Sequence, residues 1–107
     1  ERLDTSIPSE YTKLTDASAA NTPNTNYVVP ANTEIDNLKL QMNGTKLFIL
    51  GTVTMIDNYM NGWPQTPGSI IVKKGGKLIL KRGTNRIFGN GGTLYVEEGG
   101  TKAAASD

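Results

Sequence analysis

Turn-forming residues recur at an interval of eight along most of this chain. The interval is set by four glycines: Gly75, Gly83, Gly91 and Gly99. Steps of eight from Gly75 toward the N-terminus reach Pro67, Tyr59, Gly51 and Asn43, and only Tyr59 lies outside a turn-forming pair. Glycine, asparagine and proline permit or pre-set the backbone angles of turns, so the chain must turn about every eight residues.

Short apolar runs fill the intervals between these turns. The runs lie at residues 47–50, 53–56, 70–72, 78–80, 87–88 and 94–96. They are rich in β-branched and aromatic residues, and they are too short for helices. A further strand at 27–29 ends at Pro30, which cannot donate to a β-ladder. Short strands at regular spacing predict an all-β fold, which is a sandwich, a barrel or a solenoid.

Two arrangements of strands fit a step of eight residues. In an antiparallel meander or sandwich, each turn is a hairpin. In a single-stranded β-helix, two steps make one coil of about sixteen residues. A hairpin at 75–76 would place Lys74 directly opposite Lys77. Like charges that are directly opposed destabilise an antiparallel pair, so the hairpin is the less favourable arrangement.

Parallel stacking at a separation of sixteen gives better side-chain pairs. Leu78 then lies over Leu94 in an apolar row. Two pairs of opposite charge follow: Lys81 with Glu97, and Arg82 with Glu98. We therefore predict a short β-solenoid with coils of about sixteen residues, and we keep the antiparallel meander or sandwich as the alternative.

Residues 1–26 differ from the remainder of the chain, because they contain no glycine and few large apolar residues. A terminal coil exposes strand edges and apolar side chains unless something covers it. We interpret 1–26 as a polar arm or cap, or a link to an upstream domain, and 27–107 as the solenoid domain. The capping residues at 4–11 fit a short helical turn, and residues 16–21 fit either another turn of helix or a loose loop. The start at Glu1 fits a mature form or an excised segment, and 101–107 reads as a frayed end or a cut through a longer protein.

Composition narrows the possible chemistry. The chain has 107 residues, a net charge of +1, no cysteine and no histidine. This charge gives no case for nucleic-acid binding, and no apolar run approaches the roughly 20 residues that span a bilayer. Without cysteine and histidine, disulfides, zinc–thiolate sites and the usual general bases are absent. Glu97 and Glu98 are adjacent on a strand and point to opposite faces, so they cannot act as a glycosidase pair. We expect a non-enzyme with no cofactor and no membrane insertion.

The segment at 57–69 interrupts the regular pattern and contains the single tryptophan. Its aromatic and amide side chains suit stacking on sugar rings or contact with a protein partner. The candidates for ligand contact are Tyr59, Asn61, Trp63 and Gln65. In the alternative interpretation, Trp63 folds back and fills a gap between coils.

Asp36 and Asp57 are the candidates for a calcium site, since each is followed by asparagine and offers oxygen ligands. No ligand-dense loop of the EF-hand or nonapeptide type is present. Aspartate also caps turns. We therefore expect no metal site.

Four segments carry a resemblance to a known class of protein. GKLIL at 76–80 and GTLYV at 92–96 resemble the β-helical segments of bacterial surface proteins, as do YVVPANT at 27–33 and TKLFILGT at 45–52. Over about residues 27–102 the chain looks most like the small cell-adhesion domains of gut Bacteroidetes. The resemblance implies an exported protein at the cell surface with an adhesion-like role, and it implies no catalytic residues.

These observations lead us to expect a non-enzymatic cell-surface module for adhesion or for contact with a glycan or protein. One alternative is a structural spacer or assembly domain of a larger surface protein, with end-to-end or edge-strand self-association. The other is a fragment of a carbohydrate-active β-helix enzyme.

Overall fold

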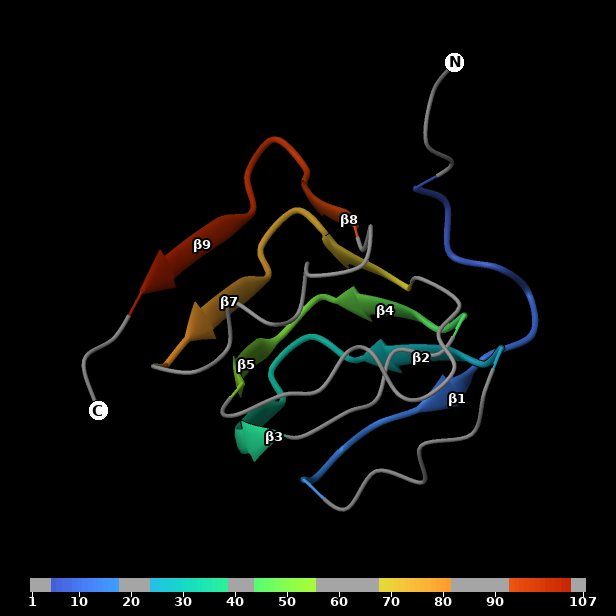
Figure 1. Ribbon diagram of the computed structural model, residues 1–107, viewed down its shortest axis with the longest axis horizontal. Helices are drawn as coiled ribbons and strands as arrows, with labels where there is room; N and C mark the ends of the chain where they lie inside the picture. Colours follow the sequence, from blue (N-terminus) through green and yellow to red (C-terminus); the bar gives the residue numbers. More distant parts are fainter. Residues whose placement is uncertain (1–4, 18–23, 39–43, 56–67, 82–92, 105–107) are drawn as a thin grey trace.

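The chain winds into parallel coils whose strands form two sheets around an apolar interior (Figure 1). The computed structural model describes residues 5–17, 24–38, 44–55, 68–81 and 93–104. These residues form nine strands: β1 (Thr12–Lys13), β2 (Asn26–Val29), β3 (Glu34–Leu38), β4 (Lys46–Ile49), β5 (Thr52–Met55), β6 (Ser69–Val72), β7 (Lys77–Leu80), β8 (Thr93–Val96) and β9 (Thr101–Ala104). In these ranges, no helix has the length and apolar character needed to cross a membrane.

From β2 onward, successive strands alternate between the two sheets. The first sheet has the order β1-β2-β4-β6-β8, and the second has the order β3-β5-β7-β9. Every pair of neighbours is parallel. Figure 1 shows the stack running from β1 and β3 at one end to β8 and β9 at the other. The predicted all-β solenoid is confirmed, and a hairpin at 75–76 is excluded because β6 and β7 lie in different sheets.

The eight-residue interval is the separation between the first residues of the two strands of a coil, in each described coil except that of β4 and β5. Ser69 begins β6 and Lys77 begins β7, eight residues later. Thr93 and Thr101, which begin β8 and β9, have the same separation. Among the turn residues of this series that the structure describes, Gly51, Gly75 and Gly99 lie at corners between the sheets.

Coil length increases along the chain. Residues of β1 pair with residues of β2 that lie 15 positions later, which is close to the predicted sixteen. Between β3 and β5 the separation is 18 residues and falls to 17 after the register shift. In the remaining pairs the separation lies between 20 and 25 residues. The added length lies in the connections from the second sheet back to the first, since thirteen residues separate β5 from β6 and twelve separate β7 from β8.

The longer coils change the predicted residue pairs. Leu78 pairs with Val53 on one side and with Lys102 on the other, rather than with Leu94. Leu94 pairs with Ile70. The individual pairing predicted at a separation of sixteen is therefore wrong, although the parallel stacking that it supported is confirmed.

The predicted ion pair of Lys81 with Glu97 is also wrong. A separation of 24 residues places Lys73 beside Glu97, and Lys73 Nζ lies 2.9 Å from Glu97 Oε2. The backbone N–H of Lys74 donates to Glu97 Oε1 at 3.0 Å. The hydrogen bond from Lys73, followed by that from Lys74, lowers the pKa of Glu97 below its ordinary value. The other predicted ion pair involves Arg82, which lies outside the described residues.

Two segments differ from their sequence-based assignment. Residues 101–104, in the tail interpreted as a frayed end or a cut through a longer protein, form β9 and pair in unbroken register with β7, so the frayed end is wrong for these four residues. The helical turn expected near 4–11 does not form in its described part, residues 5–11.

Inward-pointing side chains from both sheets fill the core. Alternate residues of a strand point to the same face, so the strands contribute stacked apolar rows. The core consists of Leu14, Tyr27, Val29, Ile35, Leu38, Leu47, Ile49, Val53, Met55, Ile70, Val72 and Leu78. Each is 5% exposed or less. Full burial of one such side chain stabilises the fold by about 1.5–3 kcal/mol.

The outer face of the first sheet carries a second apolar row, which is formed by Val28, Phe48 and Ile71. These three side chains are buried as well. Ile7 and Leu50 pack against them. The first sheet is therefore covered on both faces along this row, as its nearly continuous apolar strands require.

Residues 5–14, which we call the N-terminal strap, cross this outer face. Lys73 Nζ donates to the carbonyl oxygen of Thr5 at 2.9 Å, and Asn26 Nδ2 donates to that of Glu10 at 3.4 Å. The strap then joins the first sheet as β1, and Leu14 enters the core. Figure 1 shows the strap in blue, outside the first sheet.

Candidate functional site

The corners between the two sheets contain turns of two lengths. Residues 30–33, 73–76 and 97–100 form four-residue turns in which the last N–H donates to the first carbonyl oxygen. Their third residues, Asn32, Gly75 and Gly99, have φ angles of 66°, 84° and 91°. A positive φ at this position alone is the signature of a type II turn. Between β4 and β5, by contrast, only Leu50 and Gly51 form the corner.

The short corner lies between two long ones, because β4 is stacked between β2 and β6. The two missing residues leave a hollow of about 480 Å³, which we call the notch. It is lined by residues 31–34, 50–52 and 74–75. The notch is therefore a consequence of unequal turn lengths in stacked coils.

Glycine is required at position 51 for this arrangement. A Cβ atom there would overlap the carbonyl oxygens of Thr33 and Pro30. The close approach is held by the Thr52 N–H, which donates to the Thr33 carbonyl at 2.9 Å, and by the Lys77 N–H, which donates to the Gly51 carbonyl at 2.8 Å. The short corner is thus hydrogen-bonded to the coils on both sides, and the notch is pre-formed.

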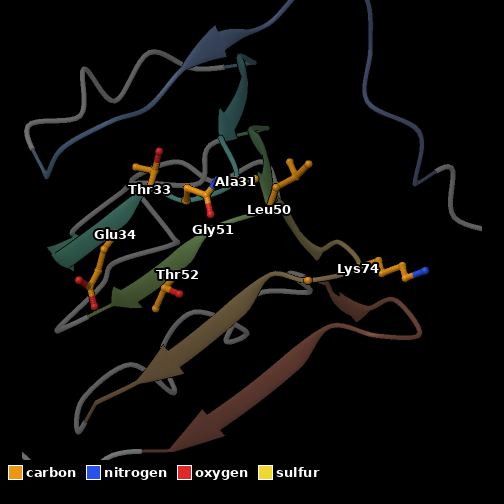
Figure 2. A pocket seen from close by; sticks show the side chains of 9 residues that line it. Ala31, Thr33, Glu34, Leu50, Gly51, Thr52 and Lys74 are labelled. Atoms are coloured by element: carbon orange, nitrogen blue, oxygen red, sulfur yellow. The ribbon is translucent and has the colours of Figure 1, made fainter.

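Polar groups from three coils surround the notch. They include the side chains of Thr33 and Glu34 from the first long turn and β3, Thr52 from β5, and Lys74 from the second long turn. Figure 2 shows Glu34 and Lys74 at opposite ends, pointing away from one another, with Gly51 between them. With the side-chain amide of Asn32, the described lining thus offers one carboxylate, one ammonium group, one amide and two hydroxyl groups over an open surface.

The site residues predicted from the sequence can be placed only in part. Tyr59, Asn61, Trp63, Gln65 and Asp57 lie outside the described residues, so their roles stay predictions. Asp36 is exposed on β3. Within the described ranges, no three aspartate, glutamate, histidine or cysteine side chains gather where they could hold a metal ion.

The notch residues were not identified from the sequence as a site. A detectable signal exists, since two residues separate the strands at 46–49 and 52–55, whereas four separate those at 69–72 and 77–80. That difference indicates a hollow only once the coils are known to stack.

Comparisons with protein-family models, with curated proteins and with solved structures find no match for this chain. Function must therefore be inferred from the geometry of this molecule.

Proposed function

We propose that this chain is a non-enzymatic module of a bacterial cell-surface protein that contacts a glycan through the notch. The observation that carries the proposal is the pre-formed polar hollow between stacked corners. A sugar presents many hydroxyl groups, each of which can donate and accept hydrogen bonds. Hydroxyl, carboxylate and ammonium groups around an open notch are suitable partners for such a ligand.

The rigidity of the corners supports binding. A pre-formed site does not have to be ordered when the ligand arrives, so less of the interaction energy is lost on association. The backbone hydrogen bonds of Thr52 and Lys77 connect the short corner to the neighbouring coils. We expect the notch to keep its shape between the free and the bound state.

The lining favours binding over hydrolysis. Hydrolysis of a glycosidic bond ordinarily uses two carboxylates on opposite sides of that bond. Among the described residues that line the notch, Glu34 is the one carboxylate. This supports a contact module rather than a fragment of a carbohydrate-active enzyme.

A spacer or assembly role is the second candidate. It is favoured by the parallel stack itself, in which each coil is hydrogen-bonded to the next, and by the edge strand at its end. Static light scattering of the isolated chain tests this role. A molar mass that rises with concentration supports assembly, and a constant monomer mass contradicts self-assembly.

A glycan array tests the notch directly. Glu34→Gln and Thr52→Val each replace one polar group of the notch with little change of shape. The matched controls, Glu10→Gln and Thr101→Val, make the same changes outside the notch, and Thr101 lies in the same row of strand residues as Thr52. We expect the two notch variants to bind at least about tenfold more weakly than wild type, and the two controls to bind as wild type does.

The proposal fails if wild type binds no glycan, or if the notch variants bind as well as wild type. A Trp63→Ala variant separates the notch from the segment predicted at 57–69. If that change alone abolishes binding, the contact surface is the predicted segment and not the notch.

A further inference from the structure

The two sheets have four edges, formed by β1 and β8 in the first sheet and by β3 and β9 in the second. An edge strand presents unpaired N–H and C=O groups that can pair with another chain. Proteins limit such pairing with very short strands, bulges, and lysine or other charges on the edge. Of the four edge strands that the structure describes, β8 alone lacks all of these features.

Both edges at the N-terminal end of the stack are protected. β1 contains two residues, and one of them is Lys13. In β3 the register shifts between Ile35 and Leu38, and Asn37 has a φ of 56°. The same irregular segment carries the exposed carboxylate of Asp36. Neither strand offers a straight, uncharged row of backbone groups.

At the opposite end, β9 is protected by a charge. Ile35, Val53 and Leu78 are successive partners in one inward row, and Lys102 is the next residue of that row. A further coil would bury the ammonium group of Lys102 against apolar side chains, and an unpaired buried charge is strongly unfavourable. The edge of the second sheet is therefore closed to another strand.

β8 (Thr93–Val96) is regular and uncharged. Its four residues pair in unbroken register with β6. Tyr95 is 42% exposed and Val96 is 37% exposed, which makes them two of the three large apolar side chains that are exposed in the described part of the chain. An exposed, regular and apolar edge strand is a template for strand addition.

The backbone of β8 also has its free donors on the open side. Thr93 and Glu97 donate their N–H groups to carbonyl oxygens of the preceding coil. The direction of the N–H groups alternates along a strand, so those of Leu94 and Val96 point away from β6. These two amides can hydrogen-bond an added strand without any loss of pairing within the sheet.

Charge indicates which strand fits beside β8. β8 is followed by Glu97 and Glu98, whereas β6 is followed by Lys73 and Lys74 at the corresponding positions. Lys73 pairs with Glu97 across the two coils. Glu98 is exposed, and the described part of the chain supplies no ion-pair partner for it. A strand that is followed by basic residues would continue the alternation of charge.

We propose that the free edge of β8 binds an extended segment of a partner polypeptide as a sixth, parallel strand of the first sheet. The inward side chains of the segment are apolar and continue the rows of Leu94 and Val96. A basic residue follows the segment and pairs with Glu98. The occupant is a single strand rather than a full coil, because Lys102 closes the neighbouring edge. This surface is separate from the notch and does not depend on glycan binding.

A labelled peptide with the sequence GSIIVKK, which is that of residues 68–74, serves as the probe. The same sequence already lies beside β8 within the chain, so its side chains match the rows. Fluorescence anisotropy measures its binding to the full chain, with GSIIVEE as the matched control peptide. We expect GSIIVKK to bind at least about tenfold more tightly than GSIIVEE.

Two variants locate the binding surface. Val96→Pro removes an outward N–H and leaves the ladder with β6 intact, since proline is tolerated on an edge strand whose N–H faces solvent. We expect at least tenfold weaker binding of GSIIVKK, whereas Val96→Thr keeps the amide and the branched shape and binds as wild type does. Glu98→Lys tests the charge pairing without introducing a proline, and it should reverse the order of affinity, so that GSIIVEE binds more tightly than GSIIVKK. Circular dichroism melting curves check that each variant is folded.

Several outcomes would overturn the proposal. One is no binding of GSIIVKK at millimolar concentration, and another is an unchanged order of the peptides with Glu98→Lys. A concentration-dependent wild-type dimer that Val96→Pro converts to a monomer would also overturn it, because the occupant of the edge would then be a second copy of the chain.

Discussion

Asn32, Gly75 and Gly99 occupy the same position in three four-residue turns at the corners of the stack, and each has a positive φ. This left-handed conformation costs a residue with a Cβ atom about 1–2 kcal/mol. Asparagine tolerates it better than most residues, and glycine adopts it freely. The chain uses asparagine once and glycine twice for the same backbone requirement.

Substitutions at two adjacent glycines should separate backbone strain from steric overlap. A Cβ atom at Gly75 meets no atom within 4 Å, so Gly75→Ala loses about 1–2 kcal/mol of unfolding free energy through the positive φ alone. Gly75→Asn should lose less. Gly76→Ala should lose most, since its Cβ atom overlaps the carbonyl oxygen of Ile49. Urea denaturation measures the three values.

The order of these losses is the test. Equal losses for Gly75→Asn and Gly75→Ala would show that φ is not the constraint at this position. A loss at Gly76 no larger than that at Gly75 would show that the corner relaxes away from Ile49.

Among the elements, the N-terminal strap has the most exposed side chains and still covers a fully apolar row. Residues 9–13 are exposed, whereas Ile7 is half-buried and Leu14 is buried. Segments with few buried contacts open at a lower free energy than the core of a domain. We therefore expect the strap to open locally while the coils stay folded.

Thiol labelling can measure this opening, because the wild-type chain has no cysteine. Val28 is 5% exposed, so the thiol of a Val28→Cys variant should react only when the strap lifts. Adding Ile7→Ala removes the strap's contact with this row. We expect the free energy of strap docking to fall by about 1–2 kcal/mol. The thiol should then be labelled about 5–30 times faster.

Ile79→Ala is the matched control, since Ile79 is a half-buried residue on the second sheet. It should leave the labelling rate of Cys at position 28 unchanged. If Ile7→Ala also leaves the rate unchanged, the strap does not shield the outer row, and Leu50 is the remaining residue that packs there among those described.

For the whole molecule, two local signals in the sequence, turn residues at intervals of eight and short apolar runs between them, were sufficient to predict an all-β fold of short strands. The choice of a parallel solenoid over hairpins is confirmed, although it depended in part on pairs at a separation of sixteen, of which Leu78 with Leu94 and Lys81 with Glu97 are wrong. Coil length was less predictable, because it depends on the connections between the sheets. Residues 56–68 lengthen one coil and leave the alternation in β5 and β6 unchanged. Leu78 therefore pairs with Val53 and Lys102, at a distance that no local pattern encodes.

The notch was unpredictable for a related reason. Leu50 and Gly51 give no chemical sign of a site, and the hollow exists only because longer turns flank theirs in the stack. Composition alone could suggest that aromatic and amide side chains such as Trp63 contact a ligand, because this prediction does not depend on how the strands pair. A site that is formed by differences between neighbouring coils can be predicted only after the register of the strands is known.

The end of the stack provides a final prediction for the whole molecule. Lys102 follows the inward row of Ile35, Val53 and Leu78, and it is the charge that closes the edge of the second sheet. Lys102→Ile extends the apolar row and leaves an uncharged edge. We expect a molar mass that rises with concentration in static light scattering, while Lys77→Ile, the same change at an exposed residue of the internal strand β7, stays at the wild-type mass. If both variants keep the wild-type mass, the charge on β9 does not limit association, and the argument that a partner adds only one strand beside β8 fails.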